Sequence, residues 1–331
     1  MQFSLLTVII GFVMGIAEVI PGVSGGTIAF ISGIYEKLID SIKAFDVKLL
    51  KLVSQMQWKK AWEKINGAFL LNLGVGMVCG IVIGIFTITY LLENYPEPLW
   101  GFFFGLVLAS AIILGKHMTP FSISKVFSII LGAGIAIWIA LVTPTQGSDN
   151  FLYIFICGMI AISAFILPGV SGSFMLLLLG TYTIIIPSLK NVISNFDGHS
   201  LSIIIVFAMG CIVGITGFSR ILSWLFHHYK AQTFAMLTGF LIGSLLKIWP
   251  WRNTTLIIDK LTGNTINISD GASWAQVSKD GIKTLKEMQV LPSDYWMGDP
   301  KTAITIICII IGFIAVYSIE RFNKPTDHIS D

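Results

Sequence analysis

The sequence predicts an all-α polytopic membrane protein made of two inverted-topology repeats, each a re-entrant broken-helix hairpin plus three transmembrane helices. Composition, the spacing of apolar blocks and an internal repeat predict this fold. Of 331 residues, 55% are hydrophobic and only 12% are charged, about half the charged fraction of an ordinary soluble domain. The runs 67–92 and 302–318 carry no charge, and apolar runs of about 20 residues are long enough to cross a bilayer. A water-soluble globule is therefore excluded.

The charge balance and the cysteines narrow the possible functions. A net charge of +3 is too small to indicate nucleic-acid binding, and no basic stripe alternates with aromatic residues. His227 and His228 have no further metal ligands near them in the sequence. Four cysteines lie in apolar segments without CxxC spacing, which argues against both disulfides and a zinc site; they are Cys79, Cys157, Cys211 and Cys308. We therefore expect no cofactor, no metal and no nucleic-acid partner.

Apolar blocks alternate with polar turns along the chain, and two polar segments are longer than the rest. Segment 36–64 has seven lysines against four acids, with apolar residues at helical spacing, and predicts an interfacial amphipathic helix that faces anionic lipid. Segment 251–301 has mixed charges and predicts an external subdomain or loop. The apolar blocks are 3–34, 67–92, 98–115, 124–143, 151–188, 201–226, 231–250 and 302–319. The first block lacks the basic start and the cleavage site of a signal peptide, so we expect it to be retained.

A repeated motif divides the chain into two units, 1–143 and 144–331. The pentapeptide Pro-Gly-Val-Ser-Gly occurs at 21–25 and again at 168–172, an offset of 147 residues, and the same offset relates Gly33 and Tyr35 to Gly180 and Tyr182. So many matches in fixed register indicate two copies of one unit. A second register, with an offset of 134, relates Gly76, Gly80, Tyr95, Gly105 and Ser110 to Gly210, Gly214, Tyr229, Gly239 and Ser244.

The blocks 3–34 and 151–188 exceed one simple span and carry the motif at mid-block, so each is predicted to dip into the membrane and return to its own side. Three crossings follow each hairpin, and an odd number of crossings inverts the second unit relative to the first. If 36–64 is cytoplasmic, the short inside segments hold twelve Lys or Arg and the short outside segments hold only Lys190, as the positive-inside rule requires. Both termini are then cytoplasmic.

The two motifs are the candidate site. Proline lacks an amide donor and glycine allows a positive φ, so we expect the helices to break at Pro21-Gly22 and at Pro168-Gly169. Each following half-helix exposes backbone N–H groups, which together with nearby hydroxyls favour a phosphate or a carboxylate. A Gly-rich packing kink is the alternative for one copy, but duplication in inverted units favours a site. The predicted ligands are Ser24, Gly25, Gly26, Thr27, Ser171, Gly172 and Ser173.

Three ionisable residues add to this prediction. Arg220 is the only basic residue deep in block 201–226, where a charge is costly, so it either neutralises a bound anion or extends to the interface near His227. Glu18 precedes the first motif and either couples a proton or accepts hydrogen bonds from the half-helix amides. Lys247 is interpreted as a residue that extends to the outer interface.

A family resemblance rests on Glu18, 21–27, 33–36, 167–173, Gly243-Ser244 and Trp249-Pro250. Together these resemble the bacterial PopT family of polyprenyl-phosphate (undecaprenyl-phosphate) translocases, formerly a family of unknown function, over nearly the whole chain except 251–301. The resemblance implies a transporter, not an enzyme, in the bacterial cytoplasmic (inner) membrane. It would flip undecaprenyl phosphate from the outer to the cytoplasmic leaflet, so that the lipid carrier is recycled in cell-envelope and peptidoglycan synthesis. The phosphate head would bind between the two motifs, with Arg220 neutralising its charge, and oligomerisation stays open.

Two other functions stay open as well. Integral-membrane polyprenyl-pyrophosphate phosphatases also pair inverted hairpins, but they have a Pro-Gly-x-Ser-Arg-Ser motif. Gly25 and Gly172 stand where that arginine would be, and no E-x-x-x-E pair adjoins either motif, so hydrolysis would lack its usual acid–base and electrophilic groups. A small-anion channel or transporter with Gly-Ser helix ends fits the same donors, and transport of small ions would identify it.

Overall fold

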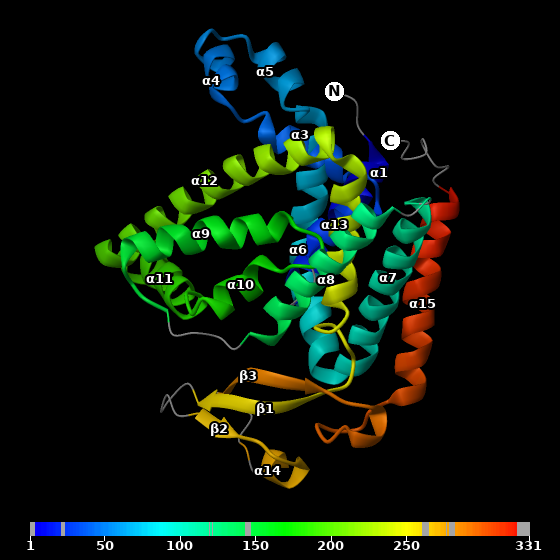
Figure 1. The fold of residues 1–331 in the computed structure, drawn as a ribbon. Helices are drawn as coiled ribbons and strands as arrows, with labels where there is room; N and C mark the ends of the chain where they lie inside the picture. The colour runs from blue at the N-terminus through cyan, green and yellow to red at the C-terminus, as the bar shows by residue number, and fades with distance from the viewer. Residues whose placement is uncertain are drawn as a thin grey trace.

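The helices of the first predicted unit follow its apolar blocks. The computed structural model describes residues 4–20, 24–118, 120, 122–142, 147–259, 265–275, 277 and 282–322. The first broken helix consists of α1 (Leu5–Val19) and α2 (Gly25–Ile31). Three long apolar helices complete this half (Figure 1): α6 (Gly67–Asn94), α7 (Pro96–His117) and α8 (Ile123–Leu141).

The second half repeats this order of elements. The second broken helix consists of α9 (Phe151–Ile166) and α10 (Gly172–Leu178), and α11 (Tyr182–Asn195) follows it. The helices that follow are α12 (Gly198–His228), α13 (Lys230–Ser244) and α15 (Thr302–Phe322). Within the described ranges, α6, α7, α8 and α12 are long and apolar enough to cross a membrane, and α10 with α11, bent by 108°, adds a fifth span if the pair counts as one. The predicted helical, multi-pass membrane protein is confirmed at this level.

α13 is shorter than the predicted block 231–250. Its 15 residues span about 22 Å, less than the roughly 30 Å of a bilayer core. Beyond Ser244 the chain continues in tighter turns, in which the amides of Leu246 and Lys247 donate to the carbonyls three residues earlier. Such turns commonly satisfy the last carbonyls of a helix. They carry the chain to the polar subdomain.

The Lys-rich segment forms three short helices, so the single amphipathic helix predicted over 36–64 is wrong. Asp46 starts a new helix because its side chain accepts the amide of Leu49 at 2.9 Å, and Met56 ends that helix at a φ of 56°. A capping side chain and a left-handed residue both interrupt helical continuity. Figure 1 shows two of the helices projecting from the bundle. They are α3 (Tyr35–Lys43), α4 (Val47–Ser54) and α5 (Trp58–Lys64), the last two being the projecting pair.

Segment 251–301 contains β-structure, so the predicted all-α class is also wrong in this part. Its sheet is antiparallel with the strand order β2-β1-β3, formed by β1 (Arg252–Asp259), β2 (Thr265–Asn267) and β3 (Ile282–Gln289). Threonine and isoleucine are β-branched residues that favour strands, and they make up four of the eight residues of Arg252–Asp259. Trp249 Nε1 donates to Val290 O at 2.8 Å and ties the sheet to the end of α13. The predicted subdomain is therefore present, as a sheet with the short helix α14 (Gly271–Ala275) and a 3₁₀ turn at Pro292–Asp294.

The subdomain and the Lys-rich helices lie at opposite ends of the bundle (Figure 1). We call these the sheet end and the α3 end. α1 begins and α15 ends at the α3 end, while the sheet lies beyond the far ends of α7, α13 and α15. This placement agrees with the prediction that 36–64 and 251–301 are on opposite sides. The side that faces the cytoplasm stays a prediction.

Glycines let four helix pairs approach closely. A Cβ added to Gly76 would clash with the Val8 carbonyl oxygen in the α1–α6 pair, and one added to Gly210 would clash with Phe155 O in the α9–α12 pair. The two glycines are 134 residues apart in the sequence, and their contact partners, Val8 and Phe155, are 147 residues apart. These separations equal the two offsets of the internal repeat. The pairs α7–α15 and α8–α13 pack in the same way through Gly105 and other glycines. Small residues that permit such contact are typical of membrane helices.

Candidate functional site at the two helix breaks

At each of the two motifs, one helix ends before the motif and another begins at its last residue. α1 ends at Val19 and α2 begins after the N-cap Ser24, whereas α9 ends at Ile166 and α10 begins after the N-cap Ser171. Pro21 and Gly22 lie outside the described residues. Pro168 and Gly169 occupy the second break, where Gly169 has a φ of 78° and a Cβ would lie 2.7 Å from Phe240 O. Only glycine combines that backbone angle with so close a neighbour.

The two motifs contact one another, although more than 140 residues separate them. Ser24 Oγ donates to Phe165 O at 3.1 Å, and the Gly169 amide donates to Thr27 Oγ1 at 2.9 Å. Tyr35, which is buried, donates its hydroxyl to Ile166 O at 3.1 Å. The bonds from Ser24 and Tyr35 satisfy carbonyls that the end of α9 would otherwise leave unpaired. The fold therefore joins the tips of the two broken helices at one place.

At the first tip, the amide donors are already occupied. The Gly25 amide donates to the Glu18 carboxylate at 2.5 Å, and the Gly26 amide donates to Ser24 Oγ at 3.1 Å. The Thr27 amide donates to Ser24 O at 2.9 Å. Glu18 therefore acts as an acceptor for the half-helix, one of the two roles considered for it. A carboxylate at this position is stabilised by the amide and by the helix dipole.

The second tip differs because Phe165 takes the place of Glu18. Here Ser171 Oγ accepts the Phe174 amide at 3.4 Å and lies 3.0 Å from Ser173 Oγ. A cleft of about 20 Å³ opens beside this tip. That volume holds about one water molecule, so a phosphate head requires the cleft to widen. Its lining comprises Ala136, Ile139, Ala140, Gly169, Val170, Ser171, Phe174, Ser244 and Lys247.

Arg220 is not brought together with either motif. Its side chain is exposed on α12, while the neighbouring Ser219 is buried, and among the described residues no hydrogen bond or ion pair joins it to the tips. The exposed position fits the alternative considered for it, a residue that extends toward the membrane interface.

Lys247 is the residue whose place the sequence interpretation missed. It lines the cleft of the second tip, and its Nζ lies 4.7 Å from the centre of the Phe174 ring. The offset of 134 pairs Lys247 with Ile113. Lys247 is charged where the other copy of the repeat has an apolar residue. This difference is the signal in the sequence that points to Lys247.

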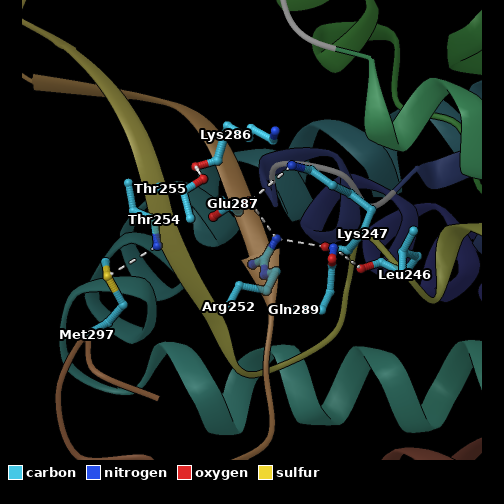
Figure 2. A network of polar contacts seen from close by, with 9 residues as sticks. All are labelled: Leu246, Lys247, Arg252, Thr254, Thr255, Lys286, Glu287, Gln289 and Met297. Carbon is cyan, nitrogen blue, oxygen red and sulfur yellow. Dashed lines mark hydrogen bonds and ion pairs between the residues drawn. The ribbon is translucent and has the colours of Figure 1, made fainter. Parts of the chain in front are cut away.

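A charged cluster holds Lys247 in place. Its Nζ lies 3.1 Å from Glu287 Oε2, and Arg252 Nη1 lies at the same distance from that oxygen. Arg252 also donates to Lys247 O at 2.7 Å and covers the Trp100 ring at 4.3 Å. Figure 2 shows the side chains of Lys247 and Arg252 directed at Glu287, which lies on β3. Burial raises the pKa of the Glu287 carboxyl. The charges of Arg252 and Lys247 together lower that pKa by a larger amount, so it lies below its ordinary value.

The α3 end has a second cavity, with a different charge pattern. It measures about 240 Å³ and is lined by Glu36, Ile39, Asp40, Phe226, His227 and Lys230. Lys230 pairs with Glu36 at 3.1 Å, and Ser223 Oγ donates to Asp40 at 2.7 Å. The two acids, Glu36 and Asp40, disfavour the binding of a further anion in this cavity. The cleft of the second tip is therefore the better place for a phosphate.

Comparison with known proteins adds independent information. Residues 14–266 match the model of a family described as undecaprenyl phosphate translocase-like. A Vibrio cholerae protein named polyprenyl-phosphate transporter is 40% identical over 250 residues, which cover 76% of this chain and 79% of that protein. A Staphylococcus aureus protein of the same name is 32% identical over 270 residues, or 78% of this chain and 90% of its own length. No solved structure matches the chain.

Proposed function

We propose that this chain, which belongs to the undecaprenyl phosphate translocase-like family, transports a polyprenyl phosphate between membrane leaflets. The names of the two relatives support the substrate class. The proposed direction is from the outer to the cytoplasmic leaflet of a bacterial cytoplasmic membrane, with both termini in the cytoplasm. The Lys/Arg bias of the loops supports this orientation. The lipid carrier would then be available again for cell-envelope synthesis.

The phosphate head is proposed to bind between the two tips. An ion that leaves water for hydrocarbon needs donors that replace its hydration shell. The hydroxyls of Ser24, Thr27, Ser171 and Ser173 and the amides that follow the breaks supply such donors. The bonds between the tips support this site because they gather both motifs at one point. The prenyl tail would stay in the lipid.

The two units are proposed to be inverted copies that rock against one another. Their glycine contacts support this, since α1–α6 and α9–α12 pack through positions related by the two sequence offsets. In a transporter of this kind, rigid units alternately open a central site to each side. Because the cleft is too small for a phosphate, the head would enter as the units separate.

Transport without hydrolysis is proposed, for a chemical reason. Gly25 and Gly172 provide no electrophilic side chain where a phosphatase of similar architecture has arginine. The other candidate, a small-anion channel, differs in what it moves. Flux of inorganic phosphate or chloride through purified protein would favour the channel, and release of free phosphate from a polyprenyl pyrophosphate would favour the phosphatase.

Removal of the side-chain hydroxyls of Ser24 and Ser171 tests the proposed phosphate site. We expect a protein with both Ser24→Ala and Ser171→Ala to flip undecaprenyl phosphate at least about tenfold more slowly, since a hydrogen bond to a charged group contributes about 1.5–3 kcal/mol. The measurement is a leaflet-resolved assay in proteoliposomes. A matched control carries Ser128→Ala and Ser202→Ala, whose exposed hydroxyls bond only within their own helices. Equal flipping rates in the two double variants would contradict the proposal that the phosphate head binds at these hydroxyls.

Glu18 is proposed to exchange a proton as the phosphate takes over the Gly25 amide. We expect Glu18→Gln to flip the lipid without acceleration by an imposed pH gradient, because glutamine accepts the same hydrogen bond but does not titrate. The assay compares flipping with and without the gradient, and Glu93→Gln, at an exposed helix end, is the control. An unchanged gradient response in Glu18→Gln would contradict proton coupling at this residue.

A further inference from the structure

The two tips have different ionisable residues beside them. At the first tip, the Glu18 carboxylate occupies the Gly25 amide, and the position equivalent to Lys247 is Ile113. At the second tip, Phe165 replaces the carboxylate and Lys247 lines the cleft. The second tip therefore attracts an anion, whereas the first tip has no cation at the equivalent position. The duplicated motifs have become unequal through these two pairs of positions.

The cluster at the second tip has more donors than acceptors. Lys247 and Arg252 share one carboxylate, that of Glu287, so the cluster keeps a net positive charge. The Arg252 side chain is only 8% exposed, and its Nε has no hydrogen-bond partner within the described residues. Buried cations with unused N–H groups favour an additional anion with several oxygens.

We propose that Lys247 receives the phosphate head at the sheet end, and that Glu287 holds its ammonium until the phosphate replaces the carboxylate. This inference rests on the proposed function, and specifies the cation and the end of the bundle at which the head enters. A phosphate monoester carries about −1.5 to −2 charges near neutral pH and three acceptor oxygens, against one charge on Glu287. It therefore competes for Lys247, and the Ser171 hydroxyl lines the same cleft.

The asymmetry also gives the transport cycle a direction of loading. A head that arrives at the sheet end meets Lys247, whereas the cavity at the α3 end is lined by the acids Glu36 and Asp40. The site for capture is thus at the sheet end. In the first unit, the position equivalent to Lys247 is Ile113, which carries no charge to hold the phosphate, so the head can be released. Arg252 acts as a positioning residue, because it anchors the Lys247 carbonyl and Glu287 together.

Binding of a short polyprenyl phosphate tests this proposal. Farnesyl phosphate is titrated into the full-length protein in nanodiscs, with farnesol as the uncharged comparison. We expect Lys247→Gln to bind farnesyl phosphate about tenfold or more weakly, since it loses a charge-assisted bond, and Lys247→Arg to restore most of the affinity. We expect Glu287→Gln to bind several-fold more tightly, because the competing carboxylate is removed. Lys286→Gln, on an exposed neighbour in β3, should change binding less than twofold.

The opposite signs separate a ligand role from a structural one. If Lys247→Gln and Glu287→Gln weaken binding equally, or if Lys247→Gln binds as the unaltered protein does, the proposal is overturned. A fall in the melting temperature of Lys247→Gln without rescue by Lys247→Arg would also overturn it. Failure of the unaltered protein to bind farnesyl phosphate and to flip the full lipid would instead contradict the proposed function. Flipping that survives Lys247→Gln would contradict this inference alone.

Discussion

Gly26→Val is expected to reduce lipid flipping by at least tenfold while the protein still inserts and folds. A Cβ at Gly26 would clash with the Ile166 carbonyl oxygen across the contact between the tips. Overpacking typically costs about 1–3 kcal/mol, and here the obstacle is backbone, which cannot rotate away. The tips would separate, and the bonds from Ser24 to Phe165 and from Gly169 to Thr27 would be lost.

Two measurements check this expectation: the leaflet-resolved flipping assay, and thermal unfolding of the purified protein. Gly74→Val is the matched control, because a Cβ at Gly74 meets no atom within 4 Å. If Gly26→Val flips the lipid as quickly as Gly74→Val, close contact between the tips is not required for transport.

Gly105→Leu is expected to have the largest effect on stability. In the pair α7–α15, a Cβ at Gly105 would clash with the Ile309 carbonyl oxygen, and Gly312 meets Phe102 O in the same pair. The helices can accept a side chain only by moving apart, which removes packing along their length. We expect a loss of about 3 kcal/mol or more, at the upper end of overpacking effects.

Thermal unfolding in detergent measures this loss, with Gly134→Leu as the control, since a Cβ at Gly134 meets nothing within 4 Å. Equal melting temperatures would show that α7 and α15 are not held by this contact. Gly26→Val and Gly105→Leu should therefore differ: the first affects transport more than stability, and the second affects both.

The helix breaks could be predicted because their cause is local. Pro168 lacks an amide donor and Gly169 adopts a positive φ, and both properties belong to the residues themselves. The division of 36–64 into three helices is local as well, since Asp46 and Met56 interrupt it. Apolar spacing alone predicts one continuous helix there, because it takes no account of the capping side chain of Asp46. Strands in 251–301 were missed because a composition of mixed charges indicates exposure and not a type of secondary structure.

The site was only partly predictable because its charges pair across the fold. Glu18 is seven residues from Gly25, but its role depends on how α1 and α2 meet. A charge within an apolar run is costly, which favours a functional role for Arg220, but the sequence does not show which face of α12 carries it. Lys247 and Glu287 are 40 residues apart, and only the docking of β3 onto the end of α13 brings them together.

The sequence by itself determined the membrane-spanning class, the duplicated motif, the ends of helices next to it, and the family to which the chain is similar. These follow from composition, hydropathy and backbone preferences, which act over a few neighbouring residues. Only the tertiary structure decided which tip carries a carboxylate and which carries a cation, and that Arg220 lies outside both. Electrostatic interactions depend on distance in space and on burial, and neither quantity can be obtained from the order of residues alone.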